Sequence, residues 1–273
     1  MSRPFQQVDV FAATPLRGNP VAVVLGADGL STEDMARLAR WTNLSETTFV
    51  LAPTDAPADY RVRIFTPAAE LPFAGHPTIG TCHAWLRAGG VPAADIVVQE
   101  CAAGLIRVRR DGGRLAFAAP PLLRSGPVDE ATLAAVVAGL GVARADVVDA
   151  AWADNGPGWI AVRLATPTAV LALSPTTLAH DVGVVAVDET GGGLEVRAFF
   201  PLAGVTREDP VTGSLNASVA QWLLGAGVLT APYVARQGTA LGRQGRVHIS
   251  QDDDGQVWVG GDAVTVIDGD ITM

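Results

Sequence analysis

The chain has 273 residues, 49% of them hydrophobic, with a formal net charge of −9, and this length supports one or two domains around a sizeable core. The acidic balance, without a basic block or interleaved aromatic and basic residues, argues against a nucleic-acid partner. All 19 basic residues are arginine, and the absence of lysine excludes Schiff-base chemistry on a lysine and a Walker A phosphate loop.

The first forty residues give strand and helix signals. Residues 1–15 lack the apolar segment of a secretory signal, and no apolar run reaches the roughly 18 residues that span a bilayer. We therefore expect a cytoplasmic protein with no membrane partner. Strands are predicted at residues 5–12 and 21–26, on either side of a turn. Ser31, followed three positions later by an acidic residue, predicts a helix that ends near Trp41.

A carboxylate opens the next predicted strand. β-branched and aromatic residues from Thr47 to Leu51 indicate a strand that enters a core, and Glu46 stands directly before them. A solvated strand end would explain this acid, and so would an acid/base group at the rim of a site. The residues alone leave both interpretations open.

The remaining pattern alternates strands with three helices. Residues 60–67 alternate as a strand does. Pro77 suits the first turn of the helix that follows, and Gly89 with Gly90 suits its end. Strands then follow at 95–111 and 113–120, a helix near 129–139, strands near 159–165, 183–188 and 193–204, a loop entering a helix over 208–228, and strands at 246–250 and 256–269.

Two segments resemble each other across the halves of the chain. Residues 64–86 and 198–223 each run from a strand ending in an aromatic residue and proline, through a loop, into a helix that carries Trp-Leu. Trp85 and Trp222 are 137 positions apart (222 − 85), about half the chain. Chance similarity of two strand–loop–helix units is the alternative to a repeat.

An internal repeat of this size predicts two similar domains related by a pseudo-twofold axis. We place them at 1–119 and 120–273, with the C-terminal strand as a candidate to complete the first. Both repeated helices are rich in small residues, so a curved sheet can enclose each of them tightly. The expected fold class is α+β, with a sheet wrapped around a central helix in each domain.

The starts of these two helices carry the candidate site. A helix N-terminus presents N–H groups and a partial positive charge, so two such ends at a cleft would hold a small carboxylate. Each polar residue there also has an ordinary explanation as a strand end, cap or turn residue. As a set they predict a proton-transfer site, made of Glu46, His76, Asp209 and Ser214, with Thr212 and Gly213 beside them.

Other reactive residues fit less specific roles. His83 falls inside the first helix and is expected to pack. His180 and His248 lack paired ligand spacing, so no metal site is expected. Cys82 and Cys101 are expected to be reduced, packed thiols.

Four segments in order resemble the PhzF family of phenazine-biosynthesis-type isomerases, which have the diaminopimelate epimerase fold. They are GNPVAVV (18–24), NLSETTFV (43–50), FTPAAELPFAGHPTIGT (65–81) and EDPVTGS (208–214). The resemblance implies two similar domains, each a barrel-like, mostly antiparallel sheet around a central helix, with the site in the cleft between them. It also implies a small carboxylate-bearing substrate, no metal, no organic cofactor, and commonly a homodimer.

Carried over residue by residue, the resemblance implies that Glu46 is the catalytic acid/base. It implies catalytic roles for His76, beside Gly75 at the first helix, and for Asp209 and Ser214 at the second. It also implies substrate-binding positions at Gly75, Thr212 and Gly213. The family's named reaction is isomerisation of trans-2,3-dihydro-3-hydroxyanthranilate, in which the glutamate takes a proton from one ring carbon and returns one to another. An apolar wall behind Glu46 would raise its pKa toward neutrality and suit this role.

Two alternatives remain beside this isomerase. Related racemases use two cysteines, one at each helix start, where this chain has Ala74-Gly75-His76 and Val211-Thr212-Gly213. A two-thiol racemase is therefore disfavoured. An epimerase of a small acid that uses the same glutamate, and a non-catalytic small-molecule binder, stay open.

Overall fold

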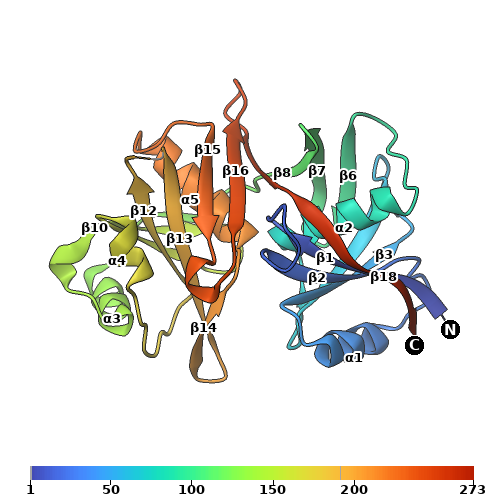
Figure 1. Cartoon of the computed structure of the whole chain (residues 1–273), viewed down its shortest axis with the longest axis horizontal. Helices are drawn as coiled ribbons and strands as arrows, with labels where there is room; N and C mark the ends of the chain where they lie inside the picture. Colours follow the sequence, from blue (N-terminus) through green and yellow to red (C-terminus); the bar gives the residue numbers. More distant parts are fainter. Residues whose placement is uncertain (1, 191) are drawn as a thin grey trace. The chain divides into compact units, whose positions relative to one another are not determined.

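The computed structural model describes residues 2–190 and 192–273, which form two compact units. Unit 1 is Met1–Ala118 with Gly260–Met273, and unit 2 is Ala119–Val259. Figure 1 labels the helices and many of the strands of each unit. In the described part of the chain, no helix is long and apolar enough to cross a membrane.

Unit 1 is built from a mostly antiparallel sheet and two helices. Its elements are β1 (Ser2–Val10), β2 (Asn19–Val24), α1 (Thr32–Thr42), β3 (Glu46–Leu51), β4 (Tyr60–Phe65), β5 (Glu70–Leu71), α2 (Gly75–Arg87), β6 (Ile96–Cys101), β7 (Gly104–Asp111), β8 (Arg114–Ala118) and β18 (Ala263–Thr272).

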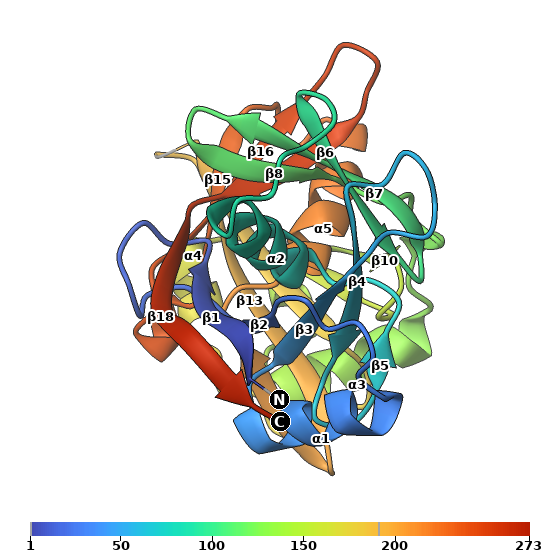
Figure 2. The same ribbon diagram turned by 90° about the vertical axis from the view of Figure 1, so that its right-hand side faces the viewer.

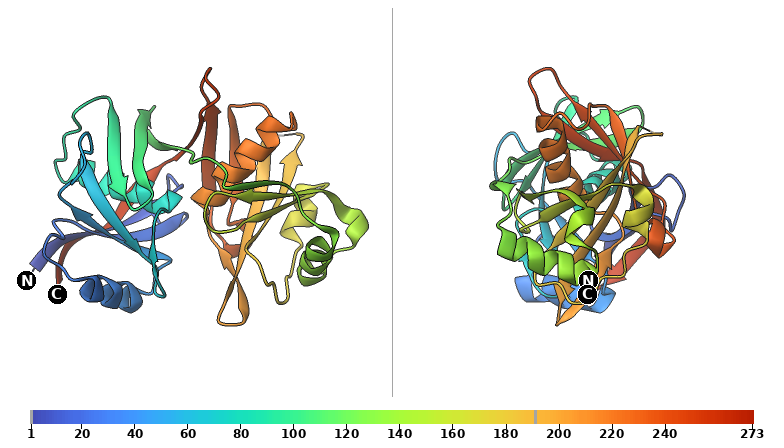
Figure 3. Two further views of the ribbon diagram at one scale, coloured as in Figure 1. Left: turned by 180° about the vertical axis from the view of Figure 1, so that it is seen from behind. Right: turned by 90° about the vertical axis from the view of Figure 1, so that its left-hand side faces the viewer.

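The strands of unit 1 follow the order β18-β1-β2-β3-β4-β6-β7-β8, and β5 pairs with the end of β4. The β2–β3 and β4–β6 pairs are parallel, and the others are antiparallel. Pairing of β1 with β18 brings the two ends of the chain together in this unit (Figure 3).

The helix α2 is enclosed by this sheet. It contacts β1, β2, β3, β6, β8 and β18, and Figure 2 shows strands of unit 1 around it. Small residues make this close enclosure possible: a Cβ added at Gly80 would lie 2.3 Å from Val21 Cγ1. The second helix, α1, packs instead on β3 and β4. As predicted, Ser31 caps α1 by accepting a hydrogen bond from the N–H of Asp34.

Unit 2 repeats this plan with extra helices. Its elements are β9 (Arg124–Pro127), α3 (Glu130–Leu140), a 3-10 turn (Arg144–Asp146), β10 (Val147–Asp154), β11 (Ile160–Leu164), α4 (Pro167–Leu171), β12 (Val182–Asp188), β13 (Gly193–Leu202), β14 (Val205–Asp209), α5 (Gly213–Gly225), β15 (Tyr233–Gln237), a 3-10 turn (Thr239–Leu241), β16 (Gly245–Gln251) and β17 (Val257–Gly261), whose last two residues pass into unit 1.

The strand order of unit 2 is β9-β10-β11-β12-β13-β15-β16, and β14 pairs with the end of β13. The β11–β12 and β13–β15 pairs are parallel. The central helix α5 has the same length as α2, 13 residues, and most of its residues are buried. The expected α+β class, with mostly antiparallel strands around a central helix, is confirmed.

The repeat is visible in the pairing of strands. In each unit a strand, its hairpin partner, the central helix and a parallel strand follow in order: β4, β5, α2 and β6 in unit 1, and β13, β14, α5 and β15 in unit 2. The helix starts, Gly75 and Gly213, are 138 positions apart (213 − 75). Trp85 and Trp222 are only 137 positions apart, so they do not occupy equivalent positions in their two helices.

Several elements differ from the sequence predictions. Strands β9, β10 and β15 and the helix α4 were not predicted. The segment that contains Asp209 was expected to be a loop, but residues 205–209 form β14. The turn before it is Ala203-Gly204, with φ of 51° and 78°, which matches the type I′ geometry of a two-residue hairpin.

Candidate active site

Glu46 is the first residue of β3, and its neighbours tie this strand end to both helices of unit 1. Thr47 and Thr48 are fully buried. The Thr47 hydroxyl lies 2.8 Å from that of Thr42 in α1, and the Thr48 hydroxyl accepts a 2.8 Å hydrogen bond from Thr81 in α2. The Glu46 side chain keeps 15% of its surface exposed. It is therefore anchored at its base and partly buried at its carboxylate.

His76, the second residue of α2, faces this carboxylate. The distance from His76 Nε2 to Glu46 Oε2 is 3.3 Å, and only 5% of the His76 side chain is exposed. On the other side of the ring, Asn19 Nδ2 lies 3.4 Å from His76 Nδ1. A neutral imidazole has a single ring proton: on Nε2 it would lie on the Glu46 side of the ring, and on Nδ1 it would lie on the Asn19 side.

Burial keeps the His76 ring uncharged. Desolvation lowers the pKa of His76 to about 3, and a backbone hydrogen bond at Pro20 only partly opposes this effect. A neutral ring beside Glu46 does not cancel the charge of its carboxylate. This leaves Glu46 as the candidate proton-exchange group of unit 1.

Asn19 has no role in the sequence predictions, although it lies within the GNP triplet of the first family-like segment. The loop before it folds onto Asp9, whose Oδ2 accepts a 2.9 Å hydrogen bond from the N–H of Gly18. A Cβ at Gly18 would lie 2.1 Å from the carbonyl oxygen of Val10, so glycine is required at this close approach. These contacts hold the fully buried Asn19 at the start of β2.

In unit 2 the candidate residues lie where β14 leads into α5. Asp209 ends β14, and α5 begins at Gly213, directly after Thr212. The Thr212 hydroxyl donates a 2.6 Å hydrogen bond to Asp209 Oδ2. Behind them, the Gln237 side chain accepts from the N–H of Thr212 and donates to the carbonyl oxygen of Asp209. Asp209 is thereby held against the helix start.

Ser214 is held from a different segment, the loop after β10. Trp159 Nε1 donates to Ser214 Oγ at 3.2 Å, and Asn155 Nδ2 donates to the Ser214 carbonyl oxygen at 2.9 Å. An indole N–H can only donate, so Ser214 Oγ accepts there and its own proton is directed to another acceptor. This arrangement suits donation to a carboxylate or to a developing anion.

Both helix starts also offer backbone donors. The N-cap residues, Ala74 and Thr212, are extended, and neither caps its helix with a side-chain hydrogen bond. The N–H groups of the first turn and the positive end of the helix dipole favour an anion at such a position. Gly75 and Gly213 are the first helical residues and are buried.

The structure assembles the predicted residues in two sets. Glu46, Gly75 and His76 lie together in unit 1. The second set lies in unit 2, and its members are Asp209, Thr212, Gly213 and Ser214. The supporting residues Asn19, Asn155, Trp159 and Gln237 were missed, because they come from segments distant in the sequence.

The remaining reactive residues are placed elsewhere. His83 Nε2 lies 2.9 Å from the Thr265 hydroxyl, which agrees with a packing role. Cys82 and Cys101 are free thiols and buried. Burial raises the pKa of Cys82 to about 12 and also raises the pKa of Cys101. Neither lies at a helix start, so a two-thiol arrangement is not formed. Across residues 2–190 and 192–273, no group of three or more His, Cys, Asp and Glu side chains is arranged to hold a metal ion.

The chain is similar to known proteins in sequence and in structure. The sequence model of the family described as phenazine biosynthesis-like protein, PhzC-PhzF, matches residues 8–269. A Schizosaccharomyces pombe protein named antisense-enhancing sequence 1 is 39% identical over 97% of both chains. The Pseudomonas aeruginosa trans-2,3-dihydro-3-hydroxyanthranilate isomerase is 36% identical, over 91% of this chain and 90% of its own.

Solved structures give the same family and a related fold. A PhzF-family protein of Enterococcus faecalis superimposes with a TM-score of 0.82 at 25% identity, covering 100% of both chains. A hydroxyproline epimerase of Agrobacterium vitis has a TM-score of 0.61 at 13% identity, covering 99% of this chain and 92% of its own, and shares the fold alone. The chain is an isomerase, and it belongs to the phenazine biosynthesis-like PhzC-PhzF family.

Proposed function

We propose that this isomerase moves a proton between two carbon atoms of a small cyclic amino or hydroxy acid, as trans-2,3-dihydro-3-hydroxyanthranilate isomerase does. Glu46 takes the proton from one carbon and returns one to the other, without a metal or an organic cofactor. The observation that carries the proposal is the pairing of a partly buried carboxylate with a neutral imidazole 3.3 Å away. Relatives about 35% identical that carry this isomerase name support the substrate class.

His76 serves as a hydrogen-bond donor rather than as a second acid. A cationic histidine would pair with Glu46 and reduce its basicity, whereas a buried neutral ring with its proton on Nε2 would donate one hydrogen bond to the carboxylate when substrate binds. When Glu46 takes up a proton, the interaction weakens, so the ring favours return of that proton to the substrate. Asn19 supports this role from the far side of the ring.

The unit 2 residues act on the substrate's polar groups. Ser214 donates a hydrogen bond from its hydroxyl to the substrate carboxylate, because its oxygen already accepts from Trp159. The N–H group of Gly213 stabilises negative charge on the substrate. Asp209, with Thr212 donating to it, accepts a hydrogen bond from the substrate amine or hydroxyl.

The test is ¹H NMR in D₂O with trans-2,3-dihydro-3-hydroxyanthranilate and the wild-type protein. We expect consumption of the substrate, with deuterium at the carbon that receives the proton. Deuterium at a carbon whose only change is its configuration would indicate an epimerase that uses the same glutamate. Binding of the substrate without any deuterium uptake would contradict the proposal and favour a non-catalytic binder.

A further inference from the structure

A buried glutamine joins the parallel strand β15 to the start of α5. Gln237 is the last residue of β15 and has no exposed surface. We propose that Gln237 is a positioning residue for the isomerisation: it fixes the Thr212 hydroxyl as a donor to Asp209. The inference rests on the proposed function, in which Asp209 binds a polar group of the substrate.

The Gln237 amide uses all of its hydrogen-bonding capacity. Its oxygen accepts from the Thr212 N–H at 3.0 Å and from Asn216 Nδ2 at 2.8 Å. Its nitrogen donates to the Asp209 carbonyl oxygen at 3.1 Å and to Thr212 Oγ1 at 2.9 Å. Reversing the amide would set donors against donors, so its orientation is fixed by its partners.

This orientation determines the direction of the next hydrogen bond. A threonine hydroxyl has one proton. Because Thr212 Oγ1 accepts from Gln237, that proton is directed to Asp209 Oδ2, 2.6 Å away. A short hydrogen bond from a hydroxyl to a carboxylate stabilises the ionised form. Gln237 therefore keeps the Asp209 carboxylate as an acceptor, and its effect on that carboxylate passes through the Thr212 hydroxyl.

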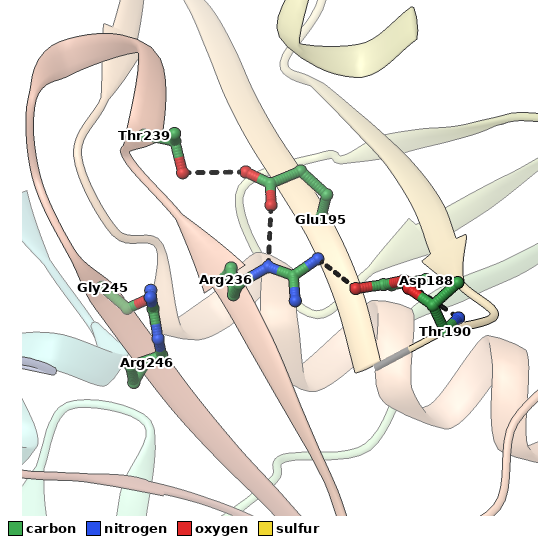
Figure 4. Close-up of polar contacts among 7 residues, drawn as sticks. All are labelled: Asp188, Thr190, Glu195, Arg236, Thr239, Gly245 and Arg246. Carbon is green, nitrogen blue, oxygen red and sulfur yellow. Dashed lines mark hydrogen bonds and ion pairs between the residues drawn. The ribbon is translucent and has the colours of Figure 1, made fainter. Parts of the chain in front are cut away.

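The strand that carries Gln237 is anchored on its other face. Neighbouring Arg236 donates to Glu195 at 3.1 Å and to Asp188 at 2.7 Å, and Thr239 donates to Glu195 at 3.0 Å (Figure 4). Side chains alternate across a strand, so Arg236 secures one face while Gln237 reaches the helix start from the other. A site residue on a rigid element is held in place more accurately than one on a loop.

Unit 1 provides a matched comparison. Gln99 lies 138 positions earlier (237 − 99), on the equivalent parallel strand β6, and is also fully buried. Its nitrogen donates to Thr78 Oγ1 at 3.0 Å, and its oxygen accepts from the Tyr60 hydroxyl at 3.1 Å. Thr78 in turn donates to the Ala74 carbonyl oxygen. Gln99 thus supports its helix without a hydrogen bond to a candidate catalytic side chain.

The test compares Gln237→Met with Gln99→Met, which remove buried amides of equal size. We expect similar losses of thermal stability. For Gln237→Met alone we expect kcat for trans-2,3-dihydro-3-hydroxyanthranilate to fall between about 10- and 100-fold, the scale of a misplaced catalytic group. In a Thr212→Val background the further effect of Gln237→Met should largely disappear, because the two residues act in series. Equal kcat losses in the two glutamine variants, or independent effects of Gln237 and Thr212, would overturn the proposal.

A second measurement does not depend on the substrate. The ¹³C signal of the Asp209 carboxyl is followed against pH without ligand. In Gln237→Met we expect the Asp209 titration to move to higher pH, because the fixed donor is lost, and in Gln99→Met we expect no change. This result, together with an inactive wild type, would retain the role of Gln237 and reject the proposed substrate. An unchanged Asp209 titration in Gln237→Met would reject the role of Gln237 whatever the substrate is.

Discussion

Replacing Gly80 with alanine tests the close enclosure of α2 that holds His76 in place. Gly80 lies one turn after His76 in α2. An added Cβ would lie 2.3 Å from Val21 Cγ1 and 3.0 Å from Val10 Cγ2. Ordinary carbon–carbon contacts are about 3.5–4.0 Å, so the overlap with Val21 exceeds 1 Å. Both valines are fully buried in β1 and β2, which leaves them little room to move.

Two opposing terms set the expected stability change. Alanine is favoured over glycine inside a helix by about 1 kcal/mol, and overpacking a core costs typically about 1–3 kcal/mol. The overlap here is with β-branched side chains on paired strands, so we place the cost at the upper end or above it. We expect a net loss of about 2 kcal/mol in the free energy of unfolding, or a Tm lower by about 4–8 °C.

Urea unfolding of Gly80→Ala, with Gly225→Ala as the control, measures this change. A Cβ at Gly225, the last residue of α5, would meet no atom within 4 Å, so this control should be neutral or stabilised by up to about 1 kcal/mol. Val21→Ala removes the clashing methyl groups. The double variant with Gly80→Ala should therefore lose less stability than the sum of the single losses. Wild-type stability of Gly80→Ala, or simple additivity, would refute the described packing of α2 on β2.

Three further predictions concern His76, the two cysteines and Trp159. Because burial lowers the pKa of His76 to about 3, the unfolded chain takes up a proton near pH 6.5 that the folded chain does not. The free energy of unfolding should therefore fall as the pH is lowered from 7.5 to 5.5, and in urea unfolding His76→Gln should reduce that fall by about 1.4 kcal/mol. An equal fall in both proteins would contradict a neutral buried ring. The buried thiols of Cys82 and Cys101, with raised pKa values, should resist iodoacetamide in the native protein and react in urea, and rapid native labelling of either would show that it is accessible. Trp159→Phe should raise KM for the carboxylate substrate about 5- to 20-fold with a smaller change in kcat, because it frees Ser214 to donate elsewhere; an unchanged KM would remove the positioning role of the indole.

The part of the site near Glu46 follows from local sequence signals. A run of β-formers after Glu46 predicts β3, and Pro77 in a first turn predicts the start of α2. The cap of α1 at Ser31 is also local. These signals depend on residues only a few positions apart, and the structure agrees with them.

The supporting residues depend on contacts between distant segments, and no local pattern predicts them. Gln237 reaches Thr212 across 25 positions, and Asn19 reaches His76 across 57. The strand β15 that carries Gln237 contains few strong β-formers, since its pairing with β13 and β16 specifies it instead. The spacing of Trp85 and Trp222 indicates the repeat, but the offset that relates equivalent residues of the two halves is given by the helix starts, Gly75 and Gly213.

The central claim is that Glu46 carries the proton, and Glu46→Gln tests it most directly. The amide keeps the shape of the side chain but cannot take up a proton. The rate of deuterium incorporation from D₂O into product is measured for this variant, the wild type and Glu33→Gln, an exposed control in α1. We predict a loss of about 10²- to 10⁴-fold for Glu46→Gln with substrate binding retained, and wild-type rates for Glu33→Gln. Turnover and labelling by Glu46→Gln at close to the wild-type rate would contradict the account.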